Sequence, residues 1–231
     1  MNTAACGIKG GILIVNKPGG MTSHDVVDFV RKQLKIRKVG HAGTLDPIAT
    51  GVLLILVGQY TKLFDRFCNF EKEYYATLTL GERTNSGDRE GKVIQAGDYS
   101  HVTKDKVEDV LTAYTGKVFQ VPPMVSAIKH KGKRLYSLAR CGIEINRQPR
   151  PIMIKKLSLL EFNLPHIKLY IKCSKGTYVR QLAEDIAKDL HCVGHISEIQ
   201  RRSIGPFDLS QAIGLSQINE SNLRPYQFKT P

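Results

Sequence analysis

A glycine-rich loop followed by a buried strand is the feature that most constrains this fold. Residues 40–51 read Gly-His-Ala-Gly-Thr-Leu-Asp-Pro-Ile-Ala-Thr-Gly, and six apolar residues follow at 52–57. The glycines permit a tight turn and the close approach of a ligand. Pro47 has a fixed φ and favours an extended conformation at Asp46. We therefore predict a rigid loop that holds the Asp46 carboxylate at the lip of a cleft, where it can act as nucleophile or base. A tight turn in which Asp46 bonds to nearby backbone fits the same spacing.

The length and the apolar pattern indicate an ordinary globular protein. A chain of 231 residues can bury one core, so we expect a single domain over residues 1–231 that carries a sizeable insertion. The longest apolar run, at 52–57, is far shorter than the roughly 20 residues of a membrane helix. The apolar stretch at 12–15 is too short for the core of a signal peptide. These features predict a cytoplasmic protein without a membrane span.

The cysteines favour neither disulfides nor a metal centre. Their number is five, and none forms a Cys-x-x-Cys pair. An odd count argues against a disulfide framework. Cys192 lies between His191 and His195, but no second group of ligands is spaced to complete a zinc site. We therefore expect free thiols and no bound metal.

Positive charge is concentrated in two stretches. The formal net charge is +13; residues 31–38 contain five basic residues and no acid, and residues 129–156 contain nine against Glu144 alone. The rest of the chain is therefore nearly neutral. Two basic surfaces on a neutral body are typical of a protein that binds a polyphosphate, and we favour nucleic acid over a solvated charged face.

Hydrophobic periodicity predicts strands, helices and one insertion. The expected strands are residues 11–18, 51–58, 74–80 and 166–173. One helix is expected from Thr22 or Ser23 to about Leu34, a second between a Thr103 cap and Gly116, and a third that ends near Gly194. Residues 81–97 have the composition of a loop, and the proline-rich, basic residues 122–151 are expected to protrude. This order predicts an α+β fold in which helices pack on a mixed sheet.

Three side chains remain as candidates for chemistry. The chain contains neither of the glycine-rich phosphate-binding motifs, and no distinctive signature of Ser/His/Asp hydrolysis or of a paired-carboxylate glycosidase. The candidates are Asp46, Tyr74 at the start of a strand, and Arg180 at the start of a helix. Each also fits a purely structural role: a turn carboxylate, a half-buried tyrosine and a solvated arginine.

Together, these residues and their surroundings resemble one enzyme family. The chain resembles the TruB-type tRNA pseudouridine synthases over about residues 10–207. The segments that carry the resemblance are residues 11–23, 38–64, 72–75, 81–88, 122–140, 176–180 and 194–199. The resemblance implies the pseudouridine synthase fold, a mixed and largely antiparallel central sheet flanked by helices. It also implies an isomerase that converts uridine 55 in the tRNA T-loop to pseudouridine and uses no metal or organic cofactor.

The resemblance also implies roles for individual residues. Asp46 would be the essential carboxylate, which either attacks C1′ of the ribose or abstracts a ribose proton. Arg180 would supply the compensating charge, because its fork can bind a carboxylate with two hydrogen bonds. Tyr74 would stack on the uracil and take the C5 proton.

Substrate contacts follow from the same resemblance. Tyr178 and Ile199 would line the base pocket, His41 would fill the space that the flipped nucleotide leaves, and Lys17 with Pro18 would support the catalytic loop. The insertion at about 122–151 would grip the T-arm of tRNA. Its RNA-backbone contacts would come from Lys129, Lys131, Lys133, Arg134 and Arg140.

Two departures from the family pattern affect these expectations. The chain ends at Pro231, too soon after Phe207 for the separate C-terminal RNA-binding domain of many members, so we expect the insertion to carry more of the binding. Ile199 and Gln200 replace a usual leucine and a frequent arginine.

We expect a monomer. An RNA-binding or tRNA-folding module with vestigial catalysis, and the catalytic subunit of a guide-RNA particle, are the alternatives.

Overall fold

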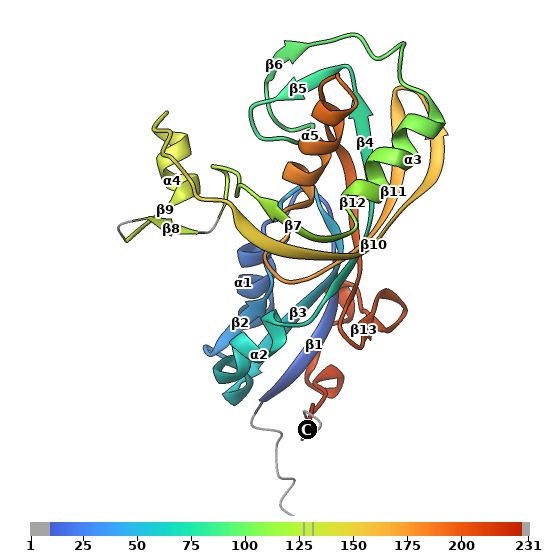
Figure 1. Ribbon diagram of the computed structural model, residues 1–231. Helices are drawn as coiled ribbons and strands as arrows, with labels where there is room; N and C mark the ends of the chain where they lie inside the picture. Colours follow the sequence, from blue (N-terminus) through green and yellow to red (C-terminus); the bar gives the residue numbers. More distant parts are fainter. Residues whose placement is uncertain (1–9, 127, 131, 228–231) are drawn as a thin grey trace, which may run out of the picture. The chain divides into compact units, whose positions relative to one another are not determined.

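The chain forms two compact units. The computed structural model describes residues 10–126, 128–130 and 132–227. The first unit comprises the chain up to Lys72 together with the residues from Gln200 onwards, and the second comprises Glu73–Ile199. Strand β12 (Gly194–Ile204) passes from the second unit into the first (Figure 1). None of the described helices is long and apolar enough to cross a membrane.

The first unit is built around strand β3 (Thr50–Gly58), which contains the apolar run at 52–57. Strand β1 (Gly10–Lys17) pairs antiparallel with β3 along its whole length. Strand β2 (Val39–Ala42) is also antiparallel to β3, and the end of β12 joins it in parallel, with Gln200 opposite Thr50. Strand β13 (Phe207–Asp208) pairs with β12. This sheet places the residues of the 43–49 loop between β2 and β3.

Aromatic side chains from both parts of the sequence close the core of the first unit. Phe67 on α2 (Phe64–Cys68) is fully buried. Its ring lies 6.1 Å from the rings of Phe70 and Phe207, and 5.5 Å from that of Tyr226, between centroids. These contacts tie the C-terminal segment to the N-terminal one, because offset and edge-on aromatic pairs add to the free energy of burial.

Helix α1 (Ser23–Leu34) begins and packs as its sequence predicts. The Thr22 hydroxyl accepts from the Asp25 amide at 3.1 Å, and the Asp25 carboxylate accepts from the Thr22 amide at 2.8 Å. This capping box satisfies two amides of the first turn. Val26, Val27, Val30 and Leu34 form its buried face, so burial of an apolar stripe stabilises the helix.

The second unit contains a sheet in the order β12–β4–β11–β10–β7. Strand β4 spans Lys72–Leu80, β11 spans His166–Cys173 and β7 spans Gly116–Gln120. The longest strand, β10 (Arg150–Asn163), pairs antiparallel with both β11 and β7. Its register shifts twice against β11, as at β-bulges. The predicted mixed, largely antiparallel sheet is confirmed.

Two helices of the second unit bury an apolar face. Helix α5 (Val179–Asp189) buries Leu182, Ala183, Ile186 and Ala187. Helix α3 (Lys104–Ala113) follows the predicted Thr103 cap, whose hydroxyl accepts from the Lys106 amide, and buries Val107 and Leu111. The α+β class predicted from the order of elements is therefore correct.

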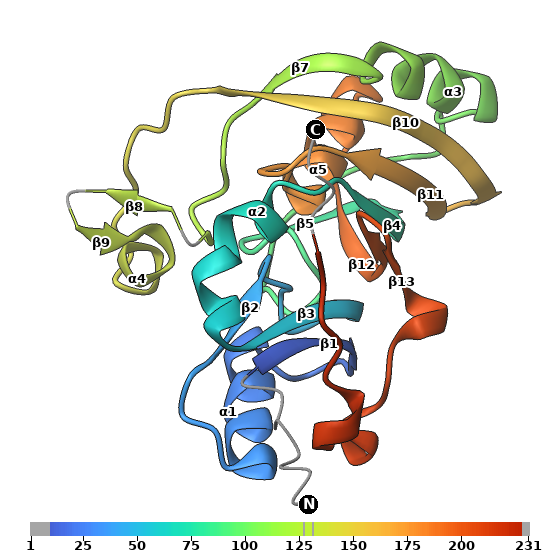
Figure 2. The ribbon, with the colours of Figure 1, turned by 90° about the horizontal axis from the view of Figure 1, so that it is seen from below.

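The predicted insertion lies between β7 and β10. It contains the short strands β8 (Lys129–His130) and β9 (Lys133–Arg134) and helix α4 (Leu135–Arg140). Figures 1 and 2 show these elements projecting from the rest of the second unit. Arg147 at its base donates to the Pro122 carbonyl at 3.1 Å, which joins the two ends of the projection.

One predicted loop is wrong. Residues 81–97 contain a hairpin of β5 (Glu82–Thr84) and β6 (Val93–Ala96). The polar composition of residues 81–97 suits a turn, but the turn occupies only the middle of this segment, between the two strands. The Thr84 hydroxyl donates to the Asp88 carbonyl at 2.7 Å and the Asn85 side chain accepts from the Lys92 amide at 3.0 Å. These polar side chains order the connection and allow the short strands to pair.

A substitution at Gly51, at the start of β3, tests how closely β3 and β12 approach each other. Gly51 has φ +98°, and a Cβ there would lie 2.2 Å from the Arg201 carbonyl oxygen. We expect Gly51→Ala to lower the free energy of unfolding by about 3 kcal/mol, through backbone strain and overpacking. Urea denaturation measures this change.

Gly20→Ala is the matched control. Gly20 also has a left-handed φ (+81°), but no atom beyond its own chain neighbours lies within 4 Å of the added Cβ. We expect a loss of about 1 kcal/mol from conformation alone. Equal losses for the two variants would contradict the close approach of Gly51 to Arg201.

Candidate active site

In the first unit, a buried lysine holds the loop that contains Asp46. The side chain of Lys17, at the end of β1, is fully buried. Its ammonium donates to the carbonyls of Pro18 at 2.8 Å, Met21 at 2.7 Å and Pro47 at 3.2 Å. A buried charge is costly unless it is hydrogen-bonded, so the position of Pro47, next to Asp46, is coupled to the folding of β1. This contact is what the predicted supporting role of Lys17 requires.

A second contact fixes the other side of Asp46. The buried Ser23 hydroxyl, at the start of α1, accepts from the Leu45 amide at 2.8 Å and donates to the Leu45 carbonyl at 3.0 Å. The residues on either side of Asp46, Leu45 and Pro47, are therefore both bonded through their backbone to side chains from the β1–α1 segment. The Asp46 carbonyl itself accepts from the Ala49 amide at 3.0 Å, which closes a turn.

A third contact comes from an arginine that was not among the predicted site residues. Arg201 on β12 is 1 % exposed. Its guanidinium donates to the carbonyls of Val52 at 2.7 Å, Gly43 at 2.9 Å and Thr44 at 3.3 Å. The only sequence signal was a charged residue at an inward position of an alternating strand.

These contacts leave Asp46 half-buried on a loop whose backbone is fixed from three sides. His41, on β2, is also half-buried, and Pro18 is exposed. The first unit therefore contains four of the predicted site residues, namely Lys17, Pro18, His41 and Asp46. The arrangement can present one carboxylate in a constant orientation, as a nucleophile or a base requires.

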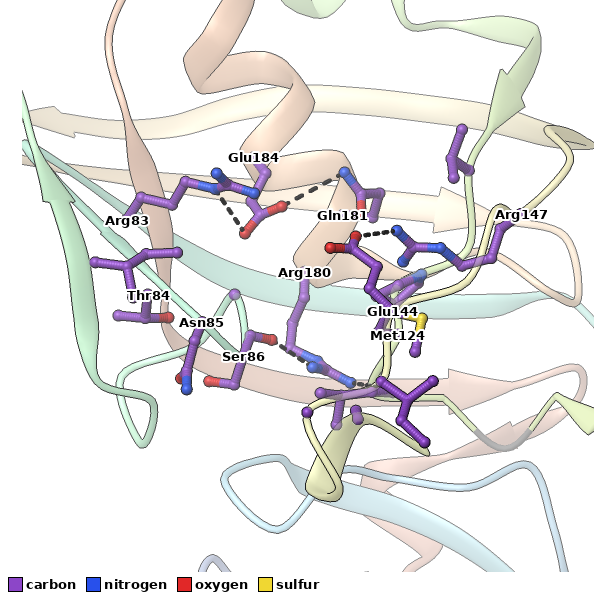
Figure 3. Close-up of a pocket in the computed structure, with 18 residues that line it drawn as sticks. Arg83, Thr84, Asn85, Ser86, Met124, Glu144, Arg147, Arg180, Gln181 and Glu184 are labelled. Atoms are coloured by element: carbon purple, nitrogen blue, oxygen red, sulfur yellow. Dashed lines mark hydrogen bonds and ion pairs between the residues drawn. The ribbon is translucent and has the colours of Figure 1, made fainter. Parts of the chain in front are cut away.

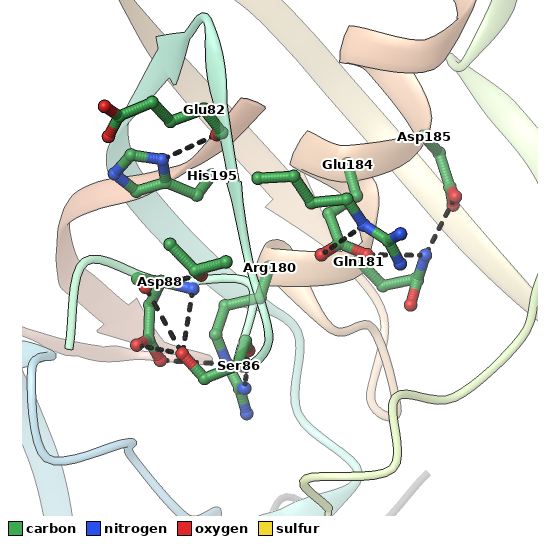
Figure 4. A network of polar contacts seen from close by, with 10 residues as sticks. Glu82, Ser86, Asp88, Arg180, Gln181, Glu184, Asp185 and His195 are labelled. Carbon is green, nitrogen blue, oxygen red and sulfur yellow. Dashed lines mark hydrogen bonds and ion pairs between the residues drawn. The ribbon is translucent and has the colours of Figure 1, made fainter. Parts of the chain in front are cut away.

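In the second unit, Arg180 is the centre of a polar network. It lies in the first turn of α5 and is 3 % exposed. Its guanidinium donates to the Ser86 carbonyl at 2.5 Å and to the Val125 carbonyl at 2.9 Å. Figure 4 shows Arg180 pointing toward the turn that carries Ser86 and Asp88. The side chain thus joins α5 to the β5–β6 hairpin and to the start of the insertion.

Asp88 is the charged partner of Arg180, and no sequence pattern had indicated a role for it. Its carboxylate lies 3.7 Å from Arg180 Nε, and both side chains are nearly inaccessible. The same carboxylate accepts from the Ser86 hydroxyl at 2.7 Å and from the Glu90 amide at 3.1 Å. A buried ion pair with further hydrogen bonds orients its members well, so Asp88 fixes the rotamer of Arg180.

The second unit also contains the predicted site residues Tyr178, Tyr74 and Ile199. Tyr178 precedes α5, and the buried Gln120 side chain holds its peptide: the Tyr178 amide donates to Gln120 Oε1 at 2.8 Å and its carbonyl accepts from Nε2 at 3.1 Å. Tyr74 on β4 and Ile199 on β12 are 8 % and 7 % exposed. The sheet therefore positions a tyrosine and an aliphatic side chain inward on β4 and β12.

A cavity of about 420 Å³ lies beside Arg180 (Figure 3). Two further arginines line it, each close to a glutamate: Arg83 Nε lies 3.7 Å from Glu184, and Arg147 lies 3.1 Å from Glu144. Burial raises the pKa of the Glu184 carboxyl. The cavity thus combines cationic side chains with apolar walls from the start of the insertion.

The structure describes the predicted RNA-backbone residues of the insertion only in part. Lys133, on β9, is exposed. Lys129, Arg134 and Arg140 belong to β8, β9 and α4, but the structure describes only their backbone. Lys131 lies outside the described residues altogether. The roles of these five residues stay predictions.

Titratable residues outside this site make local contacts. Among the described residues, no cluster of three or more His, Cys, Asp or Glu is placed to hold a metal ion. His195 Nδ1 lies 2.9 Å from the Glu82 carbonyl, and the Cys192 thiol donates to the Ala187 carbonyl at 3.3 Å. Burial raises the pKa of Cys192 to about 11, so this thiol is a poor nucleophile near neutral pH.

Comparison with known proteins identifies the family. Residues 31–179 match the family described as TruB family pseudouridylate synthase (N terminal domain). Among similar sequences, the tRNA pseudouridine synthase B of Clostridium tetani is 45 % identical over 94 % of this chain and 75 % of its own length. That of Geobacter sulfurreducens is 46 % identical over 91 % of this chain and 69 % of its own length.

Solved structures agree with this result. A Cbf5–Nop10–Gar1 complex contains a chain that matches with a TM-score of 0.72 and 29 % identity, over 91 % of this chain. An H/ACA RNP bound to a substrate RNA containing 2′-deoxyuridine matches with a TM-score of 0.69 and 25 % identity, over 93 % of this chain. In both cases the match covers 54 % of the solved chain, so this chain spans about half of their length. The predicted family is confirmed: this chain belongs to the TruB family of pseudouridylate synthases.

Proposed function

We propose that this chain isomerises a uridine in the T-loop of tRNA to pseudouridine. The observation that carries this proposal is the Asp46 loop, whose backbone is held by Lys17, Ser23 and Arg201. The sequence relatives are named tRNA pseudouridine synthases, which favours tRNA as the substrate.

Asp46 is the proposed reactive group. In the reaction, the bond between C1′ and N1 breaks, the uracil rotates, and a bond forms between C1′ and C5. The proton lost from C5 is balanced by one gained at N1, so the product is an isomer and no oxidant or reductant is needed. Asp46 either attacks C1′ and is later displaced, or removes a ribose proton and returns it. In both routes, its fixed backbone lowers the entropic cost of the first step.

Arg180 is the proposed electrostatic partner of Asp46. Its guanidinium is cationic, and its planar fork suits a carboxylate. Asp88 and the carbonyls of Ser86 and Val125 fix its orientation. A preoriented cation stabilises an anionic Asp46 in a site that excludes water.

The remaining substrate contacts follow the predicted roles. Tyr74 stacks on the uracil and accepts the C5 proton, and Tyr178 and Ile199 line the base pocket. His41 fills the gap that the flipped nucleotide leaves. Extruding a loop nucleotide costs a few kcal/mol, and stacking by His41 offsets part of that cost. The insertion and the basic residues at 31–38 bind the phosphates of the T-arm.

A particle subunit is the second candidate function. One solved relative belongs to a Cbf5–Nop10–Gar1 complex and another to an H/ACA RNP bound to a substrate RNA, but their identity is 25–29 %, against 45–46 % for the tRNA enzymes. The higher identity favours an enzyme that acts alone. We expect the purified chain, assayed as a monomer, to modify a bare T-arm hairpin without any other RNA.

Replacement of the carboxylate tests the proposed catalysis directly. We expect Asp46→Asn to abolish pseudouridine formation, since the amide can neither attack nor accept a proton, while tRNA affinity stays within a few fold. Mass-shift labelling of pseudouridine measures the product, and filter binding measures the affinity. Asp65→Asn, at an exposed aspartate of the same unit, is the control and should keep full turnover. Turnover near that of the parent chain in Asp46→Asn would favour an RNA-binding module instead.

A conservative change at Arg180 tests the need for its fork. We expect Arg180→Lys to lose roughly 10²-fold in turnover, because an ammonium cannot reproduce a planar, multiply bonded guanidinium and small misplacements are costly. Arg83→Lys, which alters a half-exposed arginine in the same cavity, should retain most turnover. Similar rates for the two variants would show that the fork is dispensable. Single-turnover assays with saturating enzyme separate this effect from binding.

Charge removal on the insertion tests its phosphate contacts. We expect the combined Lys129, Lys131, Lys133 and Arg134 to Ala variant to bind tRNA more weakly and with a shallower salt dependence. The parent chain, with six or so phosphate contacts, should have a log–log slope of roughly −4 to −5, and each lost contact should reduce it by about 0.7–0.9. Lys104→Ala on α3 is the control. An unchanged slope in the combined variant would mean that the insertion does not touch phosphate.

A further inference from the structure

The sheet of the second unit has a face that the proposed reaction does not use. Along β4, Tyr74, Ala76 and Leu78 are buried, whereas Tyr75 and Thr77 alternate with them and point to the opposite side. Helix α5 packs on the side of Leu78, because Ala187 and Leu78 both border Gly194. The side of Tyr75 is therefore opposite to the helix that carries Arg180. We call this side the open face.

Tyrosines on neighbouring strands meet on the open face. Tyr75 is 36 % exposed, and its ring lies 6.0 Å from that of Tyr170 on β11, between centroids. The Lys156 ammonium on β10 lies 5.5 Å from the centroid of Tyr170, and Lys172 on β11 lies 2.9 Å from Glu73 on β4. Burial and a hydrogen bond with Glu73 raise the pKa of Tyr170 to about 12, so its ring stays neutral. Two rings in contact with each other, one of them beside the Lys156 ammonium, form the centre of the face.

The face continues along β10 toward the insertion. Met153 is 39 % exposed and lies opposite Lys117 of β7. Phe119, two residues further along β7, is 69 % exposed and lies opposite Pro151. An aromatic side chain with most of its surface in water is unusual for a residue with only a packing role.

At the other end, the face is hollowed. A cavity of about 350 Å³ lies over β4, β10, β11 and β12. Its lining is polar and includes Arg89, His166, Lys168 and Ser197. The Thr79 hydroxyl joins two of these residues, 3.0 Å from His166 Nδ1 and 2.8 Å from Ser197 Oγ. Such a hollow offers donors and acceptors to a planar, polar group.

We propose that the open face binds an unpaired stretch of RNA. Exposed rings on neighbouring strands are surfaces on which bases stack, and flanking lysines neutralise the phosphates. Protein interfaces also favour aromatic residues and methionine, but lysine is depleted in them. The lysines of the open face are Lys117, Lys155, Lys156, Lys168 and Lys172. This enrichment favours RNA over a protein partner.

The charge and the length of the face agree with this occupant. Of its glutamates, Glu73 and Glu161 are in ion pairs with Lys172 and Lys168, so the other lysines give the face an excess of positive charge. Strand β10 has 14 residues and extends for about 45 Å at the usual rise. That length accommodates several nucleotides, within the 4–16 typical of single-strand binding surfaces. The RNA bound here would be distinct from the T-loop nucleotides at Asp46.

Binding of a short single strand tests this proposal. The probe is a labelled oligocytidine of about ten nucleotides, which contains no uridine and cannot be isomerised. We expect the double variant Tyr75→Ala, Lys156→Ala to bind it about tenfold more weakly than the parent chain, from the loss of one stacking surface. The log–log salt slope should become shallower by about 0.7, because one lysine is lost. Fluorescence anisotropy at several salt concentrations measures both changes.

Matched variants make the result specific. Phe64→Ala, Lys188→Ala removes one exposed aromatic and one exposed lysine elsewhere and should bind the oligomer as the parent does. Phe119→Ala, at the most exposed aromatic of the face, is a second test that does not depend on the tyrosine pair, and it should also weaken binding.

The isomerase assay separates this proposal from the proposed function. Turnover on a T-arm hairpin should be unchanged in the double variant, so a loss confined to the oligomer supports the open face. Equal oligomer binding by the parent, the double variant and Phe119→Ala would overturn the proposal. So would a parent dimer in sedimentation that dissociates in the double variant, since the face would then bind a second copy of this chain.

Discussion

Buried cations that donate to backbone carbonyls are the interaction on which the first unit depends. Lys17 and Arg201 are each removed from water and each donate to three carbonyls. An unpaired buried charge would cost several kcal/mol, so the loop around Asp46 cannot leave its position without exposing both cations to an unfavourable environment. The geometry of the carboxylate is thus a consequence of folding.

The second unit uses the same principle with a carboxylate added. Arg180 donates to the carbonyls of Ser86 and Val125, and Asp88 supplies a nearby anion. Two carbonyls from segments far apart in sequence can be reached by one side chain only if it has several donors in a fixed plane, as a guanidinium has. The residues that orient the proposed electrostatic group therefore also connect α5, the β5–β6 hairpin and the insertion.

The sequence predicted those parts of the structure that have a local cause. Glycine and proline in the 40–51 loop, the Thr22 cap of α1 and the alternation of β11 act within a few residues, and each was predicted. Arg201 and Asp88 were missed because their partners are defined only by the fold: Arg201 bonds to carbonyls 149 to 158 residues away. The hairpin at 81–97 was missed because its strands are only three and four residues long and the polar turn between them is ordered by Thr84 and Asn85.

Neighbouring residues of one strand can serve two functions because side chains alternate along it. Tyr74 and Tyr75 differ by one position on β4, so they point to opposite faces of the sheet. The first lies on the side of α5 and belongs to the proposed reaction. The second lies among lysines on the open face, and the proposed reaction assigns it no role. Of these two tyrosines, the family resemblance assigns a role only to Tyr74. The exposure, ring contacts and charges around Tyr75 are properties of this sheet, and they require their own physical explanation.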